Sequence, residues 1–149
     1  TSVDRLHFNF FVRKGHPLLP GKHLKAADVA NFGIASPTLP DEWRAYLHRL
    51  LDLGKDERLP ISVECDDVPL LKRIALSTDT VLVSVDDAVG DEVAAGQLCR
   101  LPVRIHPPVF YNVGIVALAG RTLSPVAEYA ANYLQQIIAQ RKDQPKPCA

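Results

Sequence analysis

The sequence lacks the features that would place it in a membrane or on nucleic acid. None of its apolar runs approaches the roughly 18 residues that span a bilayer, and no basic start followed by an apolar core suggests a secretory signal. Seventeen basic residues balance seventeen acidic ones among 149, so no broad basic face is left to neutralise phosphates. We therefore expect a soluble chain with no membrane partner that does not bind DNA by itself.

Cysteine is scarce and methionine is absent. The three cysteines, Cys65, Cys99 and Cys148, are widely spaced, with no C-x-x-C motif and no histidine at metal-ligand intervals. This usage indicates a reducing compartment, and we expect the cytoplasm. A chain that begins at Thr1 and contains no Met has no natural initiation site, so we expect it to be part of a longer protein.

Signatures of catalysis and metal binding are missing as well. The sequence has no G-x-S-x-G, no Walker glycine loop and no G-x-G-x-x-G after a strand, and its five histidines show neither i, i+4 pairing nor H-E-x-x-H. Cys99 beside Arg100 is more simply a small core residue than a reactive thiol. Helix capping explains one member of each pair Asp66-Asp67 and Asp86-Asp87 without further assumption, and an acid/base site that uses the other member is the alternative. We expect no metal, no cofactor and no enzyme.

The hydropathy pattern predicts strands alternating with helices up to about residue 100. The strands are predicted at 6–12, 32–35, 60–63 and 81–85, and the helices at 24–31, 41–53, 67–76 and 86–95. In the first strand the apolar residues alternate with polar ones, except at Phe11, which predicts one buried face. Parallel neighbours need a connection long enough to return, so this alternation indicates a parallel sheet with right-handed crossovers. The middle of the chain is predicted to be α/β.

Capping residues set the predicted helix ends. Asp41, Asp67 and either Asp86 or Asp87 each offer a side-chain oxygen to the free amides of a helix start. Gly54, in a left-handed conformation, and Gly96 are predicted to end two of these helices.

The last part of the chain has a different pattern. Residues 109–118 are an apolar run suited to a strand, and Ser124-Pro125 supply a capping hydroxyl and a proline suited to the first turn of a helix. This helix carries an unusually rich apolar face, made of Val126, Ala130, Tyr133, Leu134, Ile137 and Ile138. We expect another part of a protein to cover that face.

Polar side chains follow the predicted parallel strands at the edge where open sheets of this kind bind ligands. They are Ser36, Pro37, Thr38, Cys65, Asp66 and Ser84. Small hydroxyls beside helix starts are suited to a carboxylate or a similar small anion. The alternative is that these serines and threonines are ordinary turn and cap residues.

Several motifs occur in a characteristic order. Residues 13–18 read R-K-G-H-P-L after the first strand, residues 96–101 read G-Q-L-C-R-L after the helix predicted at 86–95, and residues 121–127 read R-T-L-S-P-V-A before the last helix. In order and spacing these motifs resemble the second half of the effector-binding region of LysR-type transcriptional regulators. Residues 77–80 and Val85 depart from the family, which usually has a glycine-containing turn and then a proline there.

The resemblance implies two Rossmann-like lobes, as in type 2 periplasmic binding proteins, joined by two crossing strands around a small-molecule cleft. Here residues 1–13 would be the first crossing strand, 14–108 the second lobe, 109–141 the return strand and last helix of the first lobe, and 142–149 a disordered tail. The expected fold is therefore an α/β lobe with a mixed sheet, truncated at its N-terminus. An amino-terminal winged helix-turn-helix would precede it.

The resemblance further implies a sensor that binds a small-molecule effector, forms homo-oligomers through its regulatory domains and reaches DNA only through the missing N-terminal domain. A carboxylate is a candidate effector. We expect effector contacts at Ser36, Pro37, Thr38, Asp66 and Ser84, and a hinge near Phe11 and Asn112. Two alternatives stay open: a solute-binding protein of the same fold that serves transport, and an enzyme on this scaffold that uses Cys99 or an aspartate.

Overall fold

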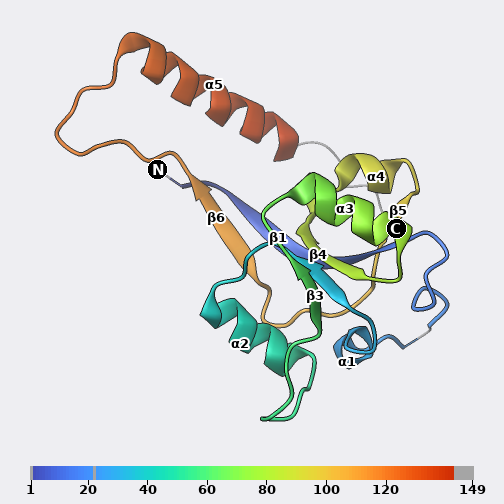
Figure 1. The fold of residues 1–149 in the computed structure, drawn as a ribbon. Helices are drawn as coiled ribbons and strands as arrows, with labels where there is room; N and C mark the ends of the chain where they lie inside the picture. Colours follow the sequence, from blue (N-terminus) through green and yellow to red (C-terminus); the bar gives the residue numbers. More distant parts are fainter. Residues whose placement is uncertain (1, 22, 143–149) are drawn as a thin grey trace. The chain divides into compact units, whose positions relative to one another are not determined.

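The computed structural model describes residues 2–21 and 23–142 (Figure 1). The chain divides into two compact units. One, called here the sheet unit, comprises His7–Val109 among the described residues, and the other, the terminal unit, combines residues 2–6 with residues 110–142. The sheet unit contains all of residues 14–108, the predicted second lobe. The domain assignment itself stays a prediction.

A mixed β-sheet forms the centre of the fold. Its strands are β1 (Ser2–Arg13), β2 (Ile34–Ser36), β3 (Ile61–Glu64), β4 (Val81–Val85), β5 (Leu98–Arg100) and β6 (Phe110–Gly114). The order across the sheet is β3-β2-β4-β1-β5, with β6 also paired to β1. Strands β2, β3 and β4 are parallel, whereas β1 runs antiparallel to β4 and β5. The predicted α/β fold with a mixed sheet is confirmed.

Helices cover both faces of the sheet in the sheet unit. They are α1 (Ala26–Val29), α2 (Asp41–Leu50), α3 (Val68–Ser77) and α4 (Gly90–Ala94). On one face Leu71 and Ala75 of α3 form a buried cluster with Phe11, Ala35 and Leu82 of the strands. On the other face α2 packs over β1, where its Trp43 ring meets Phe8 edge-on at a centroid distance of 4.6 Å.

Burial on both faces corrects the prediction for the first strand. Residues from Phe8 to Val12 are all buried, including Asn9, which was expected on an exposed face. The physical reason is that β1 lies between β4 and β5, inside the sheet, with helices packed on each side. A period-two pattern shows one buried face only where the second face meets water.

Two predicted caps are confirmed. The Asp67 carboxylate accepts a hydrogen bond from the Leu70 amide at 3.0 Å, at the start of α3. The Ser124 hydroxyl accepts one from the Ala127 amide at 3.3 Å, where helix α5 (Pro125–Lys142) begins in the terminal unit. The predicted disordered tail is wrong at Lys142, which belongs to α5, and the rest of that prediction, residues 143–149, lies outside the described residues.

The prediction that Asp41 caps a helix is wrong, because Asp41 is itself the first residue of α2. Pro40 is the cap, and its carbonyl oxygen accepts hydrogen bonds from the amides of Trp43 at 2.9 Å and Arg44 at 3.0 Å. In the first turn the carboxylate of Asp41 still interacts favourably with the helix dipole.

The prediction that Gly54 ends this helix in a left-handed conformation is also wrong. The helix α2 ends at Leu50, and the left-handed residue is Asp52, with φ of 55°. The Leu53 amide then donates to the His48 carbonyl at 3.2 Å, a bond that closes helix ends of this type. Aspartate tolerates this conformation better than most residues, because its short side chain forms local hydrogen bonds.

Neither Asp86 nor Asp87 caps a helix. They begin a 3-10 turn, Asp86–Ala88, and α4 starts after Val89 without a side-chain cap. The carboxylate of Asp86 is bonded elsewhere, as described below. The ending at Gly96 is confirmed, since Gly96 follows α4 with φ of 68°.

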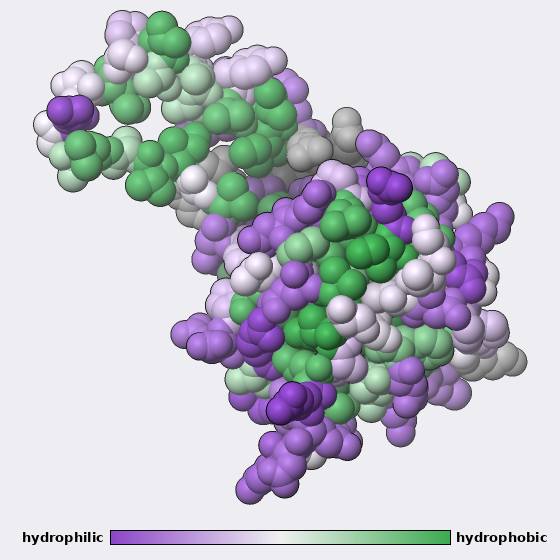
Figure 2. All heavy atoms as spheres, viewed as in Figure 1, coloured by the Kyte–Doolittle hydropathy of each residue, from purple (hydrophilic) through white to green (hydrophobic). Residues whose placement is uncertain are grey.

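The terminal unit carries a short strand and a long helix. The predicted strand 109–118 is shorter in the structure, because β6 ends at Gly114. Apolar side chains gather over this unit in the space-filling view (Figure 2), and several on α5 are exposed, among them Val126 at 78%, Tyr133 at 52% and Leu134 at 49%. In the described ranges no helix has both the length and the apolar character to cross a membrane.

Candidate functional site

The predicted effector residues lie at the carboxyl edge of the parallel strands. Ser36 is the last residue of β2, and the register that pairs Ala35 with Leu82 brings it beside the end of β4, where Ser84 lies. Asp66 follows β3, which pairs with β2 through Ser36 and Glu64. The structure therefore brings these positions to one edge of the sheet.

Ser36 and Ser84 nevertheless occupy opposite faces of the sheet. Ser84 pairs with Asn9 and follows Leu82 by two residues, so its side chain is on the face covered by α3. Ser36 follows Ala35, a residue of that same face, by one residue, so its side chain is on the face covered by α2. The sequence predicted both hydroxyls at one edge, but their faces depend on strand register.

The hydroxyl of Ser36 is fully buried and forms no hydrogen bond within the described residues. An unpaired buried hydroxyl costs about 1–3 kcal/mol. The backbone of the same residue is well held, because its carbonyl accepts the Cys65 amide at 3.2 Å.

Thr38 and Asp66 are in direct contact. The backbone amide of Thr38 donates to Asp66 Oδ1 at 2.9 Å, and the next amide, that of Leu39, donates to Glu64 Oε1 at 3.0 Å. The amides of Thr38 and Leu39, just before α2, are therefore already bonded to carboxylates of this chain. Pro37, between Ser36 and Thr38, is half-buried.

Glu64 is the most strongly held of these carboxylates. Both of its oxygens lie within hydrogen-bond distance of Arg44 Nη2 on α2. The hydrogen bond from the Leu39 amide, and then the one from Arg44, lower the pKa of Glu64 below the usual glutamate value. Glu64 therefore stays charged and keeps the loop before α2 attached to β3.

A second group of polar residues at this edge, Asn9, Asp86 and Arg100, was not predicted as a cluster from the sequence. Asn9 of β1 is 6% exposed, and its Nδ2 donates to Asp86 Oδ1 at 3.0 Å. Arg100 Nη1 of β5 lies 3.7 Å from Asp86 Oδ2. The sequence signal is an asparagine between two phenylalanines of a predicted strand, a position that the alternating pattern places on the solvent face.

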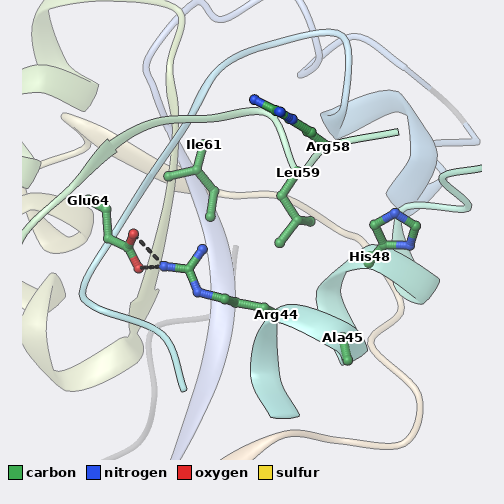
Figure 3. Close-up of a pocket in the computed structure, with 7 residues that line it drawn as sticks. All are labelled: Arg44, Ala45, His48, Arg58, Leu59, Ile61 and Glu64. Atoms are coloured by element: carbon green, nitrogen blue, oxygen red, sulfur yellow. Dashed lines mark hydrogen bonds and ion pairs between the residues drawn. The ribbon is translucent and has the colours of Figure 1, made fainter. Parts of the chain in front are cut away.

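Two hollows flank α2. The larger has a volume of about 590 Å³ and is lined by Arg44, Ala45, His48, Arg58, Leu59, Ile61 and Glu64 (Figure 3). In the close-up Arg44 points toward Glu64, while the His48 ring lies apart from them and its Nε2 lies 2.8 Å from the Glu57 carbonyl oxygen. The smaller hollow, of about 30 Å³, is lined mainly by apolar side chains of β1, β4 and a different side of α2.

The predicted hinge residues lie near the two points where the chain passes between the units. These points are Leu6–His7 and Val109–Phe110. Phe11 lies inside the sheet unit and is buried, whereas Asn112 lies in β6 of the terminal unit and is exposed. The hinge assignment stays a prediction.

Comparison with known proteins identifies the family to which this fold belongs. A family model described as the LysR substrate binding domain matches residues 2–138. The chain belongs to this family. The resemblance inferred from the motifs is therefore confirmed, and with it the type 2 periplasmic-binding-like fold.

The LysR domain described here has a curated relative at 37% identity. This relative is the SDS degradation transcriptional activation protein of Pseudomonas sp. (strain ATCC 19151), matched over 123 residues that make up 79% of this chain and 38% of the relative. The chain thus spans under two fifths of that protein.

Solved LysR effector domains share the fold at low identity. The AmpR effector domain of Pseudomonas aeruginosa matches with a TM-score of 0.67 and 13% identity, over 95% of this chain and 66% of that domain. The effector-binding domain of QuiR in complex with shikimate matches with a TM-score of 0.67 and 10% identity, over 93% and 64%. The Synechocystis PCC6803 CcmR regulatory domain in complex with 2-PG matches with a TM-score of 0.63 and 15% identity, over 93% and 65%.

Proposed function

We propose that this chain is the effector-sensing part of a LysR-type transcriptional regulator. The observation that carries the proposal is the family match over residues 2–138. A relative named for transcriptional activation and structural neighbours solved with shikimate or 2-PG support the same function. In this role the chain binds a small molecule and performs no bond chemistry.

The effector contacts in this proposal are Ser36, Pro37, Thr38, Asp66 and Ser84. Their support is the shared position at the carboxyl edge, where ligands of open parallel sheets bind. An effector carboxylate that reaches the Thr38 amide has to displace the Asp66 carboxylate, whereas an effector hydroxyl or amine can donate to Asp66 as it stands. The relative's name makes alkyl sulfates and the products of their degradation the first compounds to test.

The remaining partners belong to the whole regulator. We infer that it acts in the cytoplasm, forms homo-oligomers through its regulatory domains and binds DNA through a segment outside this chain. The neutral formal charge of the chain agrees with that division, since DNA binding depends on excess positive charge.

The test uses the full-length regulator and a labelled promoter fragment. Ser36→Ala and Thr38→Val should weaken the effector-induced change in DNA binding and leave the affinity for DNA without effector nearly unchanged. Ser77→Ala, an exposed serine at the end of α3, is the matched control and should respond like the parent. If Ser36→Ala and Thr38→Val both respond like the parent, this edge is not the effector site.

A further inference from the structure

We propose that the larger hollow beside α2 binds a small anion that carries a hydrocarbon group. This site is separate from the effector contacts proposed above and does not depend on them. The hollow has a volume of about 590 Å³, within the range of about 300–1,000 Å³ that is typical of small-molecule sites. It is lined by α2, by β3 at one end of the sheet, and by the residues just before β3.

The floor of the hollow is apolar. Leu59 and Ile61 line it together with Ala45 of α2, and in the view of Figure 3 the side chains of Leu59 and Ile61 lie between those of Arg58 and Arg44. Both Leu59 and Ile61 are only half-buried, so part of their surface is still in water. A hydrocarbon group that covers this surface is favoured, because removing apolar area from water lowers the free energy.

Arg44 supplies donors that are already held in place. Its Nε donates to the Leu39 carbonyl at 3.2 Å, and its Nη2 is bonded to both oxygens of Glu64. Among the described residues its Nη1 has no hydrogen-bond partner, so the two N–H groups of Nη1 are available to a ligand. Because the guanidinium is fixed before a ligand arrives, binding costs less conformational entropy.

Arg58 is the second cation of the lining. It is exposed and, in the part of the chain that the structure describes, forms no hydrogen bond or ion pair. Since Arg44 balances the charge of Glu64, the lining keeps the positive charge of Arg58 uncompensated when His48 is neutral. An oxyanion that accepts from Arg44 Nη1 and from Arg58 compensates this charge, and guanidinium groups bind carboxylates and similar oxyanions strongly.

An added peptide strand is the alternative occupant at an edge strand such as β3. The pairing of β2 with β3 shifts its register between Ile34 and Ala35, which marks an irregular ladder. Irregularities of this kind at a sheet edge disfavour pairing with a further strand. The register and the free charge of Arg58 therefore favour a small anion over a strand.

The experiment titrates the purified chain with sodium hexanoate and follows backbone amide signals by NMR. Sodium acetate has the same charge without the long hydrocarbon group, and hexyltrimethylammonium has the same hydrocarbon group with the opposite charge. Arg58→Gln removes the unpaired cation, and Leu59→Ala removes part of the apolar floor. Lys55→Gln is the matched control, because it removes an exposed cation of the same loop that does not line the hollow. Circular dichroism confirms that each variant is folded.

We expect hexanoate to bind saturably and to shift the amide signals of Leu59 and Ile61. Acetate and hexyltrimethylammonium should each bind at least about tenfold more weakly. Arg58→Gln should weaken hexanoate binding about fivefold. Leu59→Ala should weaken hexanoate binding about fourfold without changing acetate binding, and Lys55→Gln should match the parent.

Equal binding of hexanoate and hexyltrimethylammonium, or equal binding of hexanoate by Arg58→Gln and Lys55→Gln, would overturn the proposal. Shifts of the Leu59 and Ile61 signals that follow the protein concentration without hexanoate would also overturn it, because they would show a second copy of the chain at this edge. The response of the full-length regulator on DNA is a separate measurement, so failure of the proposed function leaves this result readable.

Discussion

The guanidinium of Arg13 holds Asp79 Oδ1 through two hydrogen bonds, at 3.0 Å from Nε and 2.7 Å from Nη2. The carbonyl oxygen of Asp79 lies 2.9 Å from His16 Nε2. His16 Nδ1 accepts the Leu18 amide at 3.1 Å, so the ring proton is on Nε2 and is donated to Asp79. The R-K-G-H-P-L segment is thereby fixed to the loop before β4, where the sequence departs from its family.

Replacing His16 should destabilise the sheet unit more than replacing Asp79. His16 is 1% exposed, and His16→Leu leaves the Leu18 amide and the Asp79 carbonyl without this partner, at about 1–3 kcal/mol for each buried group. Asp79→Asn weakens a half-exposed ion pair, for which about 0–1 kcal/mol is expected. Urea unfolding measures both, and equal losses would contradict the assigned tautomer and its two bonds.

Gly33 should not tolerate a side chain. A Cβ at Gly33 would lie 2.0 Å from Ser62 Oγ and 3.0 Å from Ser62 Cβ, so Gly33→Ala should cost about 1–3 kcal/mol through overpacking. Ser62→Gly removes both atoms, and the double variant should recover most of the loss relative to Ser62→Gly alone. A thermal or urea double-variant cycle with no coupling would show that Ser62 is not the obstacle.

Stability should fall in acid because of Glu92. Lys72 Nζ lies 2.6 Å from Glu92 Oε1, and this hydrogen bond, against the effect of desolvation, lowers the pKa of Glu92 below its usual value of 4.5. A lowered folded-state pKa gives stability that is complete above the unfolded-state pKa and is lost as the pH falls through the folded-state pKa. Urea unfolding between about pH 6 and pH 3 should therefore show a smaller acid loss in Glu92→Gln than in the parent.

The control for this measurement is Asp56→Asn, at an exposed position on the loop after α2. Its acid loss should equal that of the parent. If Glu92→Gln also follows the parent curve, the Lys72–Glu92 contact contributes nothing to the pH dependence.

The apolar face of α5 should drive self-association of the 149-residue chain. Tyr133, Leu134 and Ile137 are exposed, and exposed apolar patches associate in water. Sedimentation should show association that weakens in a Tyr133→Gln, Leu134→Gln variant and persists in Gln135→Glu. A dilute monomer whose α5 amides are protected from hydrogen exchange would argue against this expectation.

The sequence predicted the parts of the fold that depend on neighbours in the chain. Asp67 and Ser124 cap helices as expected, because a cap needs only an oxygen near the first free amides. Asp86 failed as a cap because its carboxylate bonds Asn9, which lies far away in sequence and is brought close by the pairing of β1 with β4. Local rules cannot anticipate such a competitor.

For the candidate site, too, only the features that depend on the order of elements along the chain could be predicted from the sequence. Positions at strand ends follow from the order of elements, so the edge that contains Ser36, Asp66 and Ser84 could be found. The faces on which Ser36 and Ser84 lie depend on the register between strands. The hydrogen bond of the Thr38 amide depends on the carboxylate of Asp66, in the loop after β3. Neither was available from hydropathy or spacing.

The terminal unit is built from two segments that are separated in sequence by the whole sheet unit. During synthesis, a chain that has been made as far as Val109 already contains every residue of the sheet unit, from the His7 part of β1 to β5. The first residues of β1 must wait for β6, their partner in the terminal unit, to be translated. Since domains generally fold as units as they emerge, the sheet unit can fold on the ribosome while the terminal unit is still incomplete.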